Sequence, residues 1–209
     1  MNIDFLISEL RKKYRTGTFH FKDPFKVLVS VMLSQRTRDE NTLKVTEKLF
    51  SVLKTPRQIA EVNEKKLQKL IKSSGFYRMK AKHLKETSLE IVNKYNGKVP
   101  DTLEELLTLP GVGRKTANCV LVFAFNKPAI PVDTHVHRIS NRLGLVRTKV
   151  PEETEKGLMR TVPKKYWILI NELLVKFGQD TCRPVNPKCS ECGFNKICPA
   201  AFKDNRRRS

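Results

Sequence analysis

Apolar residues recur at helical spacing along almost the whole chain. No segment shows the sustained two-residue alternation, or the run of β-branched residues, that indicates a strand. Segment 25–33 is apolar nearly all round, which predicts a helix at the centre of a core. Further apolar stripes with a helical period predict helices over 79–95, 102–108, 114–125, 134–143 and 164–177. The sequence therefore predicts an all-α fold.

Residues with specific backbone preferences mark the helix boundaries. Side chains able to cap a helix N-terminus stand just before the apolar stripes. They are Asn2, Asp23, Thr55 with Gln58, Asn63, and Asp101 with Glu104. Residues that readily adopt a left-handed backbone conformation follow the stripes and predict helix ends. They are Gly75, Asn96 with Gly97, and Gly144.

The charge balance indicates a polyanionic partner. Lys and Arg number 41 against 21 for Asp and Glu, which gives a formal net charge of +20. This favours nucleic acid, although a ribosomal protein or a merely solvated basic surface has the same character. No segment approaches the roughly 18 continuous apolar residues of a membrane span, and the N-terminus lacks the regions of a signal peptide. We therefore expect no membrane partner and a monomer of the cell interior, in the cytoplasm or at the nucleoid.

Segment 109–113 reads Leu-Pro-Gly-Val-Gly and joins two predicted helices. Its glycines allow a tight reversal and bring backbone N–H groups, at the positive start of the second helix, against a phosphate. Such contacts hold the DNA backbone without reading sequence. An ordinary loop also uses Pro and Gly, but the adjacent Arg-Lys pair and the net charge favour a helix-hairpin-helix. The predicted DNA contacts are Gly111, Val112, Gly113 and Arg114.

The string LPGVGRKTANCVL at 109–121, followed by PVDTHVHR at 131–138, resembles the endonuclease III group of helix-hairpin-helix DNA glycosylases. By that resemblance Lys115 is the nucleophile that attacks C1′ of a flipped nucleotide, expels the base and forms a Schiff base leading to strand cleavage by β-elimination. This chemistry needs a neutral amine. A lone lysine in a basic chain is ordinarily solvated or bound to phosphate, and only its place directly after the hairpin favours the catalytic role.

Asp133 resembles the essential carboxylate of the same family, which activates the lysine and stabilises positive charge on the sugar. It also precedes a predicted helix and is a good N-cap, and both roles are compatible because a cap fixes the carboxylate in place. His135 lies in the matching string and is expected either to line the pocket or to be a hydrogen-bonded structural residue, and His137 is equally open.

Four of the five cysteines crowd into the last part of the chain with the spacing C-x6-C-x2-C-x5-C. Zinc could use four thiolates, but structural zinc sites usually pair two short knuckles and only one is present. The spacing resembles the [4Fe-4S] cluster of the endonuclease III group, which implies Cys182, Cys189, Cys192 and Cys198 as ligands. The cluster is expected to hold a loop that directs Arg183, Lys188 and Lys196 toward phosphates. Cys119 lies outside the spacing and is expected to be buried.

Two segments are expected to open the duplex, since an extruded nucleotide leaves a gap in the base stack. Segment 33–39 resembles the insertion loop of the family, with Arg36 at the usual Gln position and Gln35 one residue earlier, so either side chain could enter the gap. In segment 74–78, Phe76 matches an apolar wedge of the family. A core aromatic following a helix end is the equal alternative for Phe76.

The resemblance covers essentially the whole chain. It implies a six-helix barrel over 20–130, a second helical domain formed by 1–19 and 131–209 with the cluster loop at 182–198, and a cleft between them for the flipped base. The implied function is a bifunctional DNA glycosylase and AP lyase acting on oxidised pyrimidines or abasic sites in double-stranded DNA. The alternatives are a glycosylase for thymine or uracil opposite guanine on the same scaffold, and a non-catalytic DNA-binding module.

Overall fold

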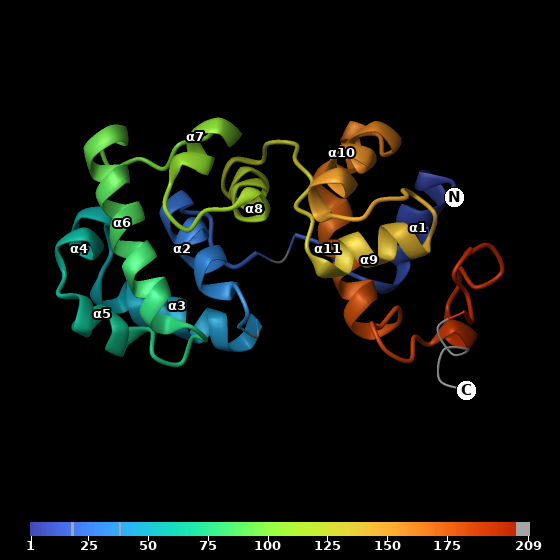
Figure 1. Ribbon diagram of the computed structural model, residues 1–209, viewed down its shortest axis with the longest axis horizontal. Coiled ribbons are helices and arrows are strands. Elements are labelled where there is room, and N and C mark those ends of the chain that lie inside the picture. The colour runs from blue at the N-terminus through green and yellow to red at the C-terminus, as the bar shows by residue number, and fades with distance from the viewer. Residues whose placement is uncertain (18, 38, 204–209) are drawn as a thin grey trace. The chain divides into compact units, whose positions relative to one another are not determined.

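The computed structural model describes residues 1–17, 19–37 and 39–203, and every regular element within these ranges is helical (Figure 1). The prediction of an all-α fold is confirmed. Contacts divide the chain into two compact units, Phe19–Lys127 and Met1–Thr18 with Pro128–Ser209. These bounds lie close to the predicted 20–130 and 1–19 with 131–209, whereas the barrel arrangement and the cluster stay predictions. Arg38, which the sequence places in the insertion loop, lies outside the described residues.

The unit Phe19–Lys127 is built around one apolar helix. Helix α2 packs against α3, α6 and α8, and Figure 1 shows it between α6 and α8. Its residues from Val27 to Leu33 are all buried, as a sequence that is apolar except for Ser30 predicts. The helices of this unit are α2 (Pro24–Ser34), α3 (Asp39–Val52), α4 (Pro56–Glu61), α5 (Glu64–Leu70), α6 (Tyr77–Tyr95), α7 (Leu103–Thr108) and α8 (Arg114–Phe125).

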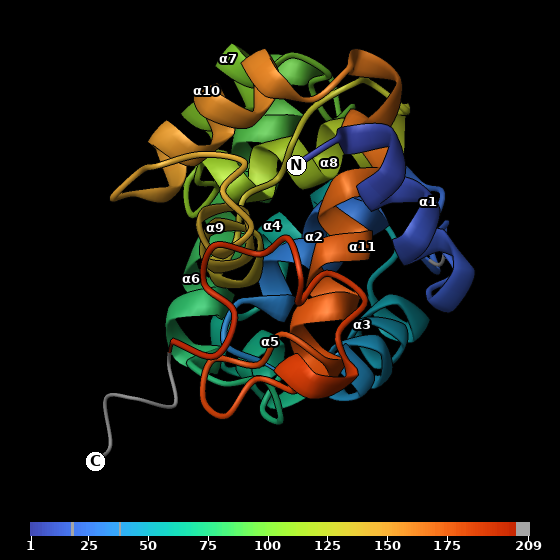
Figure 2. The same ribbon diagram turned by 90° about the vertical axis from the view of Figure 1, so that its right-hand side faces the viewer.

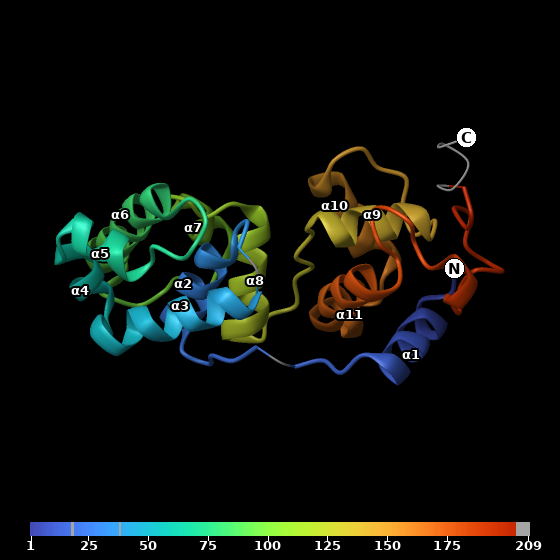
Figure 3. The same cartoon turned by 90° about the horizontal axis from the view of Figure 1, so that it is seen from below.

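The second unit joins the N-terminal helix to the C-terminal third of the chain. Helix α11 lies between α1 and α9 (Figures 2 and 3), and side chains such as Leu6, Ile139 and Phe177 form a continuous buried core. Its helices are α1 (Ile3–Lys13), α9 (Thr134–Arg142), α10 (Pro151–Thr161) and α11 (Trp167–Asp180), with short 3-10 turns at Lys164–Tyr166 and Cys189–Glu191.

Most of the predicted N-caps are confirmed. The side chains of Asn2, Asp23 and Asn63 each accept a hydrogen bond from a backbone N–H of the helix they begin. Thr55 and Gln58 form the reciprocal capping box. A cap depends on residues only two or three positions apart, which is why the sequence identifies it.

The capping box predicted from Asp101 and Glu104 is wrong. Helix α7 is capped one residue later by Thr102, whose side chain accepts from the N–H of Glu105 at 3.3 Å. The Asp101 carboxylate pairs instead with Lys127 Nζ at 2.7 Å, a partner distant in sequence. Of the two adjacent residues able to cap α7, Thr102 is the cap and Asp101 forms the ion pair.

The predicted helix ends are confirmed at Asn96, Gly97 and Gly144, which have positive φ, but not at Gly75. The left-handed residue there is Phe76, with a φ of 57°. Gly75 is required for a different reason, because a Cβ at this position would lie 3.0 Å from the carbonyl oxygen of Arg36. This glycine allows two loops to approach each other rather than ending a helix.

Two further details differ from the sequence-based predictions. Helices α3 and α10 had no assigned stripe, since polar residues interrupt their apolar faces. The helix predicted over 164–177 begins with a 3-10 turn and continues to Asp180. Among the described residues, no helix is both long and apolar enough to cross a membrane.

The cap assignment can be tested with two neighbouring variants. Thr102→Ala removes the hydroxyl that caps α7, and the free energy of unfolding should fall by about 1 kcal/mol. Asp101→Ala removes a solvent-exposed ion pair and should cost about 0.5 kcal/mol or less. Denaturant unfolding of both variants measures the difference, and a larger loss for Asp101→Ala would show that the cap is misassigned.

Candidate active site and metal centre

The predicted hairpin is present and is tightly formed. Helix α7 ends at Thr108, Gly111 adopts a φ of 74°, and Gly113 precedes α8 as an N-cap residue without a side chain. Val112 is buried, and its N–H donates to the carbonyl oxygen of Leu109 at 3.1 Å. The short turn therefore leads directly into the N-terminus of α8. A tight turn followed by a helix N-terminus is a geometry that binds phosphate.

Helix α6 supports this hairpin from behind. A Cβ at Gly111 would lie 2.7 Å from His83 Nδ1 and 2.8 Å from His83 Cβ, so the histidine ring packs directly on the glycine. The Thr87 hydroxyl donates to the carbonyl oxygen of Pro110 at 2.5 Å. From a second direction, Gln35 Nε2 donates to Thr116 Oγ1 at 3.3 Å. The hairpin is thus fixed by packing as well as by its own turn.

Lys115 is the second residue of α8 and follows the hairpin directly. Its side chain is partly buried. Arg114, the other basic residue at this helix start, is also partly buried. The structure places the sequence-predicted residues from Gly111 to Lys115 on one continuous turn and helix start within the unit Phe19–Lys127.

Asp133 belongs to the other unit and is the N-cap of α9, as predicted. Its Oδ1 accepts from the N–H of Val136 at 2.8 Å, which fixes the orientation of the carboxylate. His135 Nδ1 lies 3.2 Å from Arg138 Nη2, and His137 Nδ1 lies 2.7 Å from Thr154 Oγ1. Both histidines therefore have hydrogen-bond partners within their own unit.

Gln35 and Arg36 have different surroundings. Gln35 is exposed and its amide faces the hairpin, donating also to the carbonyl oxygen of Gly111 at 3.4 Å. Arg36 has a φ of 53°, and its guanidinium carbon lies 5.1 Å from the centre of the Phe76 ring. Phe76 is 56% exposed, which excludes the interpretation of this residue as a core aromatic.

The four clustered cysteines line one pocket in the second unit. Leu143, Phe177 and Asn195 complete much of its wall, and all four thiols are partly buried. Burial raises the pKa of Cys192 and Cys198, and the neighbouring thiols add to the shift. The buried Cys119 lies outside this pocket, as predicted.

The donor chemistry of this pocket fits an iron–sulfur cluster. Four thiolates are the usual protein ligands of a [4Fe-4S] centre. Cys182, Cys189, Cys192 and Cys198 supply such a set and all line the one pocket. The residues present therefore fit such a group.

The segment that carries the cysteines is held at its N-terminal end. Arg142, the last residue of α9, donates to the carbonyl oxygens of Arg183 at 2.6 Å and Pro184 at 3.0 Å, and to Cys182 Sγ at 3.6 Å. Lys188 Nζ lies 3.9 Å from a Glu191 carboxylate oxygen, while Arg183 is exposed. These arginine contacts fix the backbone of the segment before its second cysteine.

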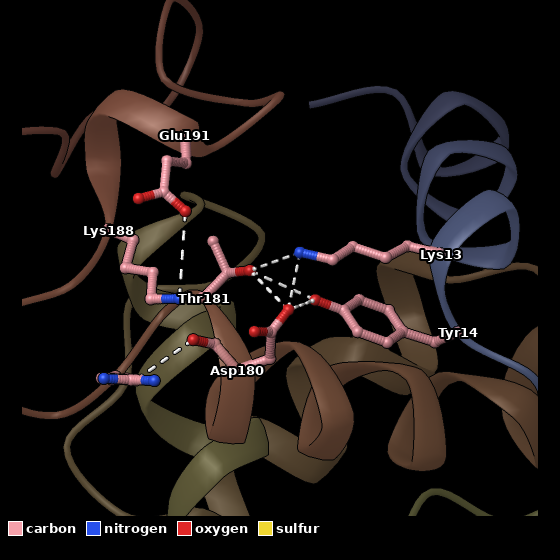
Figure 4. A network of polar contacts seen from close by, with 7 residues as sticks. Lys13, Tyr14, Asp180, Thr181, Lys188 and Glu191 are labelled. Atoms are coloured by element: carbon pink, nitrogen blue, oxygen red, sulfur yellow. Dashed lines mark hydrogen bonds and ion pairs between the residues drawn. The ribbon is translucent and has the colours of Figure 1, made fainter.

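A second anchor lies where α11 ends, just before Cys182 (Figure 4). The Asp180 carboxylate accepts from Tyr14 OH at 2.7 Å and Thr181 Oγ1 at 3.0 Å, and pairs with Lys13 Nζ at 2.6 Å. The pKa of Asp180 is held well below its ordinary value. The largest cause is the Lys13 ammonium, and the two hydroxyl groups add to its effect. These contacts join the N-terminal helix to the end of α11, directly before the cysteine segment.

Comparison with known proteins identifies the protein family of this chain. Residues 29–164 match the HhH-GPD superfamily base excision DNA repair protein family, so the hairpin and the helical fold define a helix-hairpin-helix DNA repair protein. Endonuclease III of Thermotoga maritima is 57% identical over 176 residues, which are 84% of this chain and 83% of that protein. The chain belongs to the endonuclease III family, as the resemblance in its sequence predicts.

Solved structures agree with this assignment. The trapped covalent intermediate of endonuclease III with DNA aligns with a TM-score of 0.90 and 38% identity, over 99% of this chain and 97% of that one. A thermostable thymine-DNA glycosylase aligns with a TM-score of 0.83 and 28% identity, over 96% and 95% of the two chains.

The two hairpin glycines give a matched test of the hairpin. Gly111→Ala must displace His83 and strain a left-handed residue, so the free energy of unfolding should fall by about 1–3 kcal/mol and duplex affinity should fall with it. Gly113 has a φ of −89° and a Cβ there meets no atom within 4 Å, so Gly113→Ala should leave stability nearly unchanged. Denaturant unfolding and fluorescence anisotropy measure both variants. Equal destabilisation by the two substitutions would contradict the packing described for Gly111.

Proposed function

We propose that this chain removes oxidised pyrimidines from double-stranded DNA, with Lys115 as the nucleophile and Asp133 as the carboxylate that supports it. The enzyme class follows from the family, which makes the chain a DNA glycosylase and lyase of base excision repair. The observation that carries the role of Lys115 is its position in the first turn of α8, directly after the hairpin, in a chain that aligns with a trapped covalent protein–DNA intermediate. Such an intermediate requires a nucleophile on the protein.

The proposed reaction has two bond-breaking stages. The Lys115 amine attacks C1′ of the extruded nucleotide, the bond from C1′ to the base breaks, and the base leaves with the bonding electrons and acquires a proton. Ring opening then gives a protonated Schiff base between Nζ and C1′. Loss of a proton from C2′ expels the 3′ phosphate oxygen by β-elimination, and hydrolysis of the Schiff base releases Lys115.

Asp133 supplies negative charge for this reaction. Its carboxylate is fixed by the N–H of Val136, so it does not have to be oriented during the reaction. A fixed carboxylate stabilises the positive charge that develops on the sugar and accepts the proton that the attacking amine gives up. The same hydrogen bond therefore caps α9 and, in this proposal, orients the catalytic carboxylate.

The DNA contacts are proposed for three groups of residues. Gly111, Val112, Gly113 and Arg114 hold a phosphate, since the turn and the start of α8 favour an anion. Arg183 and Lys188, on the cysteine segment, approach other phosphates. The net charge of +20 adds attraction by counterion release, so affinity falls steeply with salt. Gln35, Arg36 and Phe76 form the third group, beside the gap that an extruded nucleotide leaves in the base stack.

A glycosylase for thymine or uracil opposite guanine is the second candidate. It is favoured by the alignment with the thymine-DNA glycosylase over 96% of this chain, although the identity of 28% is lower than the 38% to the endonuclease III complex. Duplexes that carry thymine glycol, dihydrouracil, G·T or G·U, each assayed by covalent trapping, separate the two candidates. Faster trapping on the oxidised pyrimidines is the expected result.

We also infer that Cys182, Cys189, Cys192 and Cys198 bind a [4Fe-4S] cluster. The inference is supported by their common pocket and by their spacing, which resembles that of the cluster in the endonuclease III group. When bound, such a cluster supplies a four-point cross-link of segment 182–198. The contacts of Arg142 and Asp180 then hold the same segment from its N-terminal side.

Borohydride trapping tests the catalytic proposal. Wild-type protein should form a covalent adduct with lesion-bearing duplex, Lys115→Ala should form none, and Asp133→Asn should form it at least about a hundredfold more slowly, because a lost electrostatic or proton-transfer partner costs that much. Lys98→Ala is a control on an exposed lysine. An adduct of Lys115→Ala at the wild-type rate would exclude Lys115 as the nucleophile, and an unreactive wild type that still binds DNA would leave only a binding module.

Iron analysis tests the cluster. Purified wild-type protein should contain about four irons and four acid-labile sulfides per chain. Cys189→Ser should lower both contents and the unfolding temperature, whereas Cys119→Ala, which lies outside the pocket, should keep the full iron content. Zinc in place of iron in anaerobically purified protein would contradict the assignment.

A further inference from the structure

Lys80 is a buried lysine that the sequence analysis did not identify as functional. It lies in the first turn of α6 and is only 4% exposed. Its Nζ donates three hydrogen bonds, to the carbonyl oxygen of Leu33 at 2.7 Å, to Ser74 Oγ at 2.8 Å and to Thr37 Oγ1 at 2.9 Å. Three acceptors match the three protons of an ammonium group.

The environment of Lys80 is costly for a cation. All three of its acceptors are uncharged, and no carboxylate pairs with it among the side chains that the structure describes. Burial lowers the pKa of Lys80 to about 8. An apolar residue would fill this space at a smaller desolvation cost. The contribution of Lys80 therefore lies in the groups that its amine holds together.

What Lys80 joins is two loops far apart in sequence. Leu33 and Thr37 belong to the segment that carries Arg36, whereas Ser74 lies two residues before Phe76. The two backbones also touch, since a Cβ on Gly75 would lie 3.0 Å from the carbonyl oxygen of Arg36. Lys80 therefore holds the two segments together. One segment carries Arg36 and the other carries Phe76, and both of these side chains are exposed.

The two exposed side chains form a strained pair. Arg36 and Phe76 both adopt positive φ, 53° and 57°, which is costly for residues with a Cβ and persists only where the surroundings impose it. The guanidinium carbon of Arg36 lies 5.1 Å from the Phe76 ring centre, within cation–π range. A flat cation beside a flat ring is the chemistry that stacks on nucleobases. The Gln35 amide, by contrast, faces Thr116 beside the hairpin.

We propose that Lys80 is a positioning residue that clamps the two loops so that Arg36 and Phe76 act as one unit, which fills the gap left by the extruded nucleotide. In this assignment Arg36 and not Gln35 enters the base stack. The proposal rests on the proposed function, since a gap exists only when a nucleotide is extruded. Lys80 itself touches neither the DNA nor the reacting atoms.

The first experiment separates opening of the duplex from chemistry on the sugar. Lys80→Met keeps an unbranched side chain that is one heavy atom shorter and removes the three donors. Lys94→Met, at an exposed residue near the end of the same helix, is the matched control. Lys80→Met should lose about tenfold or more in base removal from duplex DNA, the loss typical of misplaced groups. On an abasic site in a single-stranded oligonucleotide, where no stack must be opened, trapping should change less than about twofold.

The second experiment observes the stack directly. A 2-aminopurine placed beside an uncleavable abasic analogue in duplex DNA becomes fluorescent when it loses its stacking neighbour. Saturating wild-type protein and Lys94→Met should give the same fluorescence change, and Lys80→Met should give a smaller one. In a double-variant cycle, Lys80→Met should add little to the loss caused by Phe76→Ala, because both remove the same unit.

The outcomes are decisive in each direction. Equal losses of Lys80→Met on duplex and single-stranded substrates, an unchanged fluorescence, or multiplicative effects with Phe76→Ala would each overturn the proposal. If Lys80→Met does not fold, Thr37→Val removes one of the three acceptors at constant shape and is expected to show the same pattern in weaker form. Failure of the proposed function is distinct, since wild type would then form no adduct on either substrate, while the fluorescence assay still tests the clamp.

Discussion

The reversal at 109–113 is the constraint on which the proposed active site depends. Gly111 adopts a φ of 74° and lies against the ring of His83, so both its backbone conformation and its surroundings exclude a larger residue. The Thr87 hydroxyl holds the preceding carbonyl of Pro110. Because α8 begins immediately after this turn, the turn sets the backbone position of Lys115.

One face of α6 supports every loop of its unit to which we assign a DNA contact. Lys80, His83 and Thr87 are spaced by three and four residues, which places them along one side of the helix. Lys80 joins the segments that carry Arg36 and Phe76, and the other two residues support the hairpin. A single rigid helix therefore sets the positions of three loops, and a binding surface gains precision when its loops share one support.

In the other unit, α9 connects the proposed catalytic carboxylate to the cysteine segment. Asp133 caps its start, and Arg142 at its end holds the backbone of 183 and 184. Asp180 fixes the end of α11 through Lys13 and Tyr14 of the N-terminal segment. The cysteine segment is thus located by hydrogen bonds to ordered helices, and a cluster bound there would stabilise an arrangement whose N-terminal part is already formed.

The sequence by itself determined what depends on close neighbours: most of the helices and their caps, the hairpin with the position of Lys115, the capping role of Asp133 and the spacing of the cysteines. It failed at residues whose contacts lie far away in the sequence, such as Asp101, which pairs with Lys127, and Gly75, which lies against the carbonyl oxygen of Arg36. Only the tertiary structure showed that Lys80 is buried, since two of its acceptors lie 43 and 47 residues away. Sequence pattern records local preference, whereas burial and long-range hydrogen bonds exist only after the chain has folded.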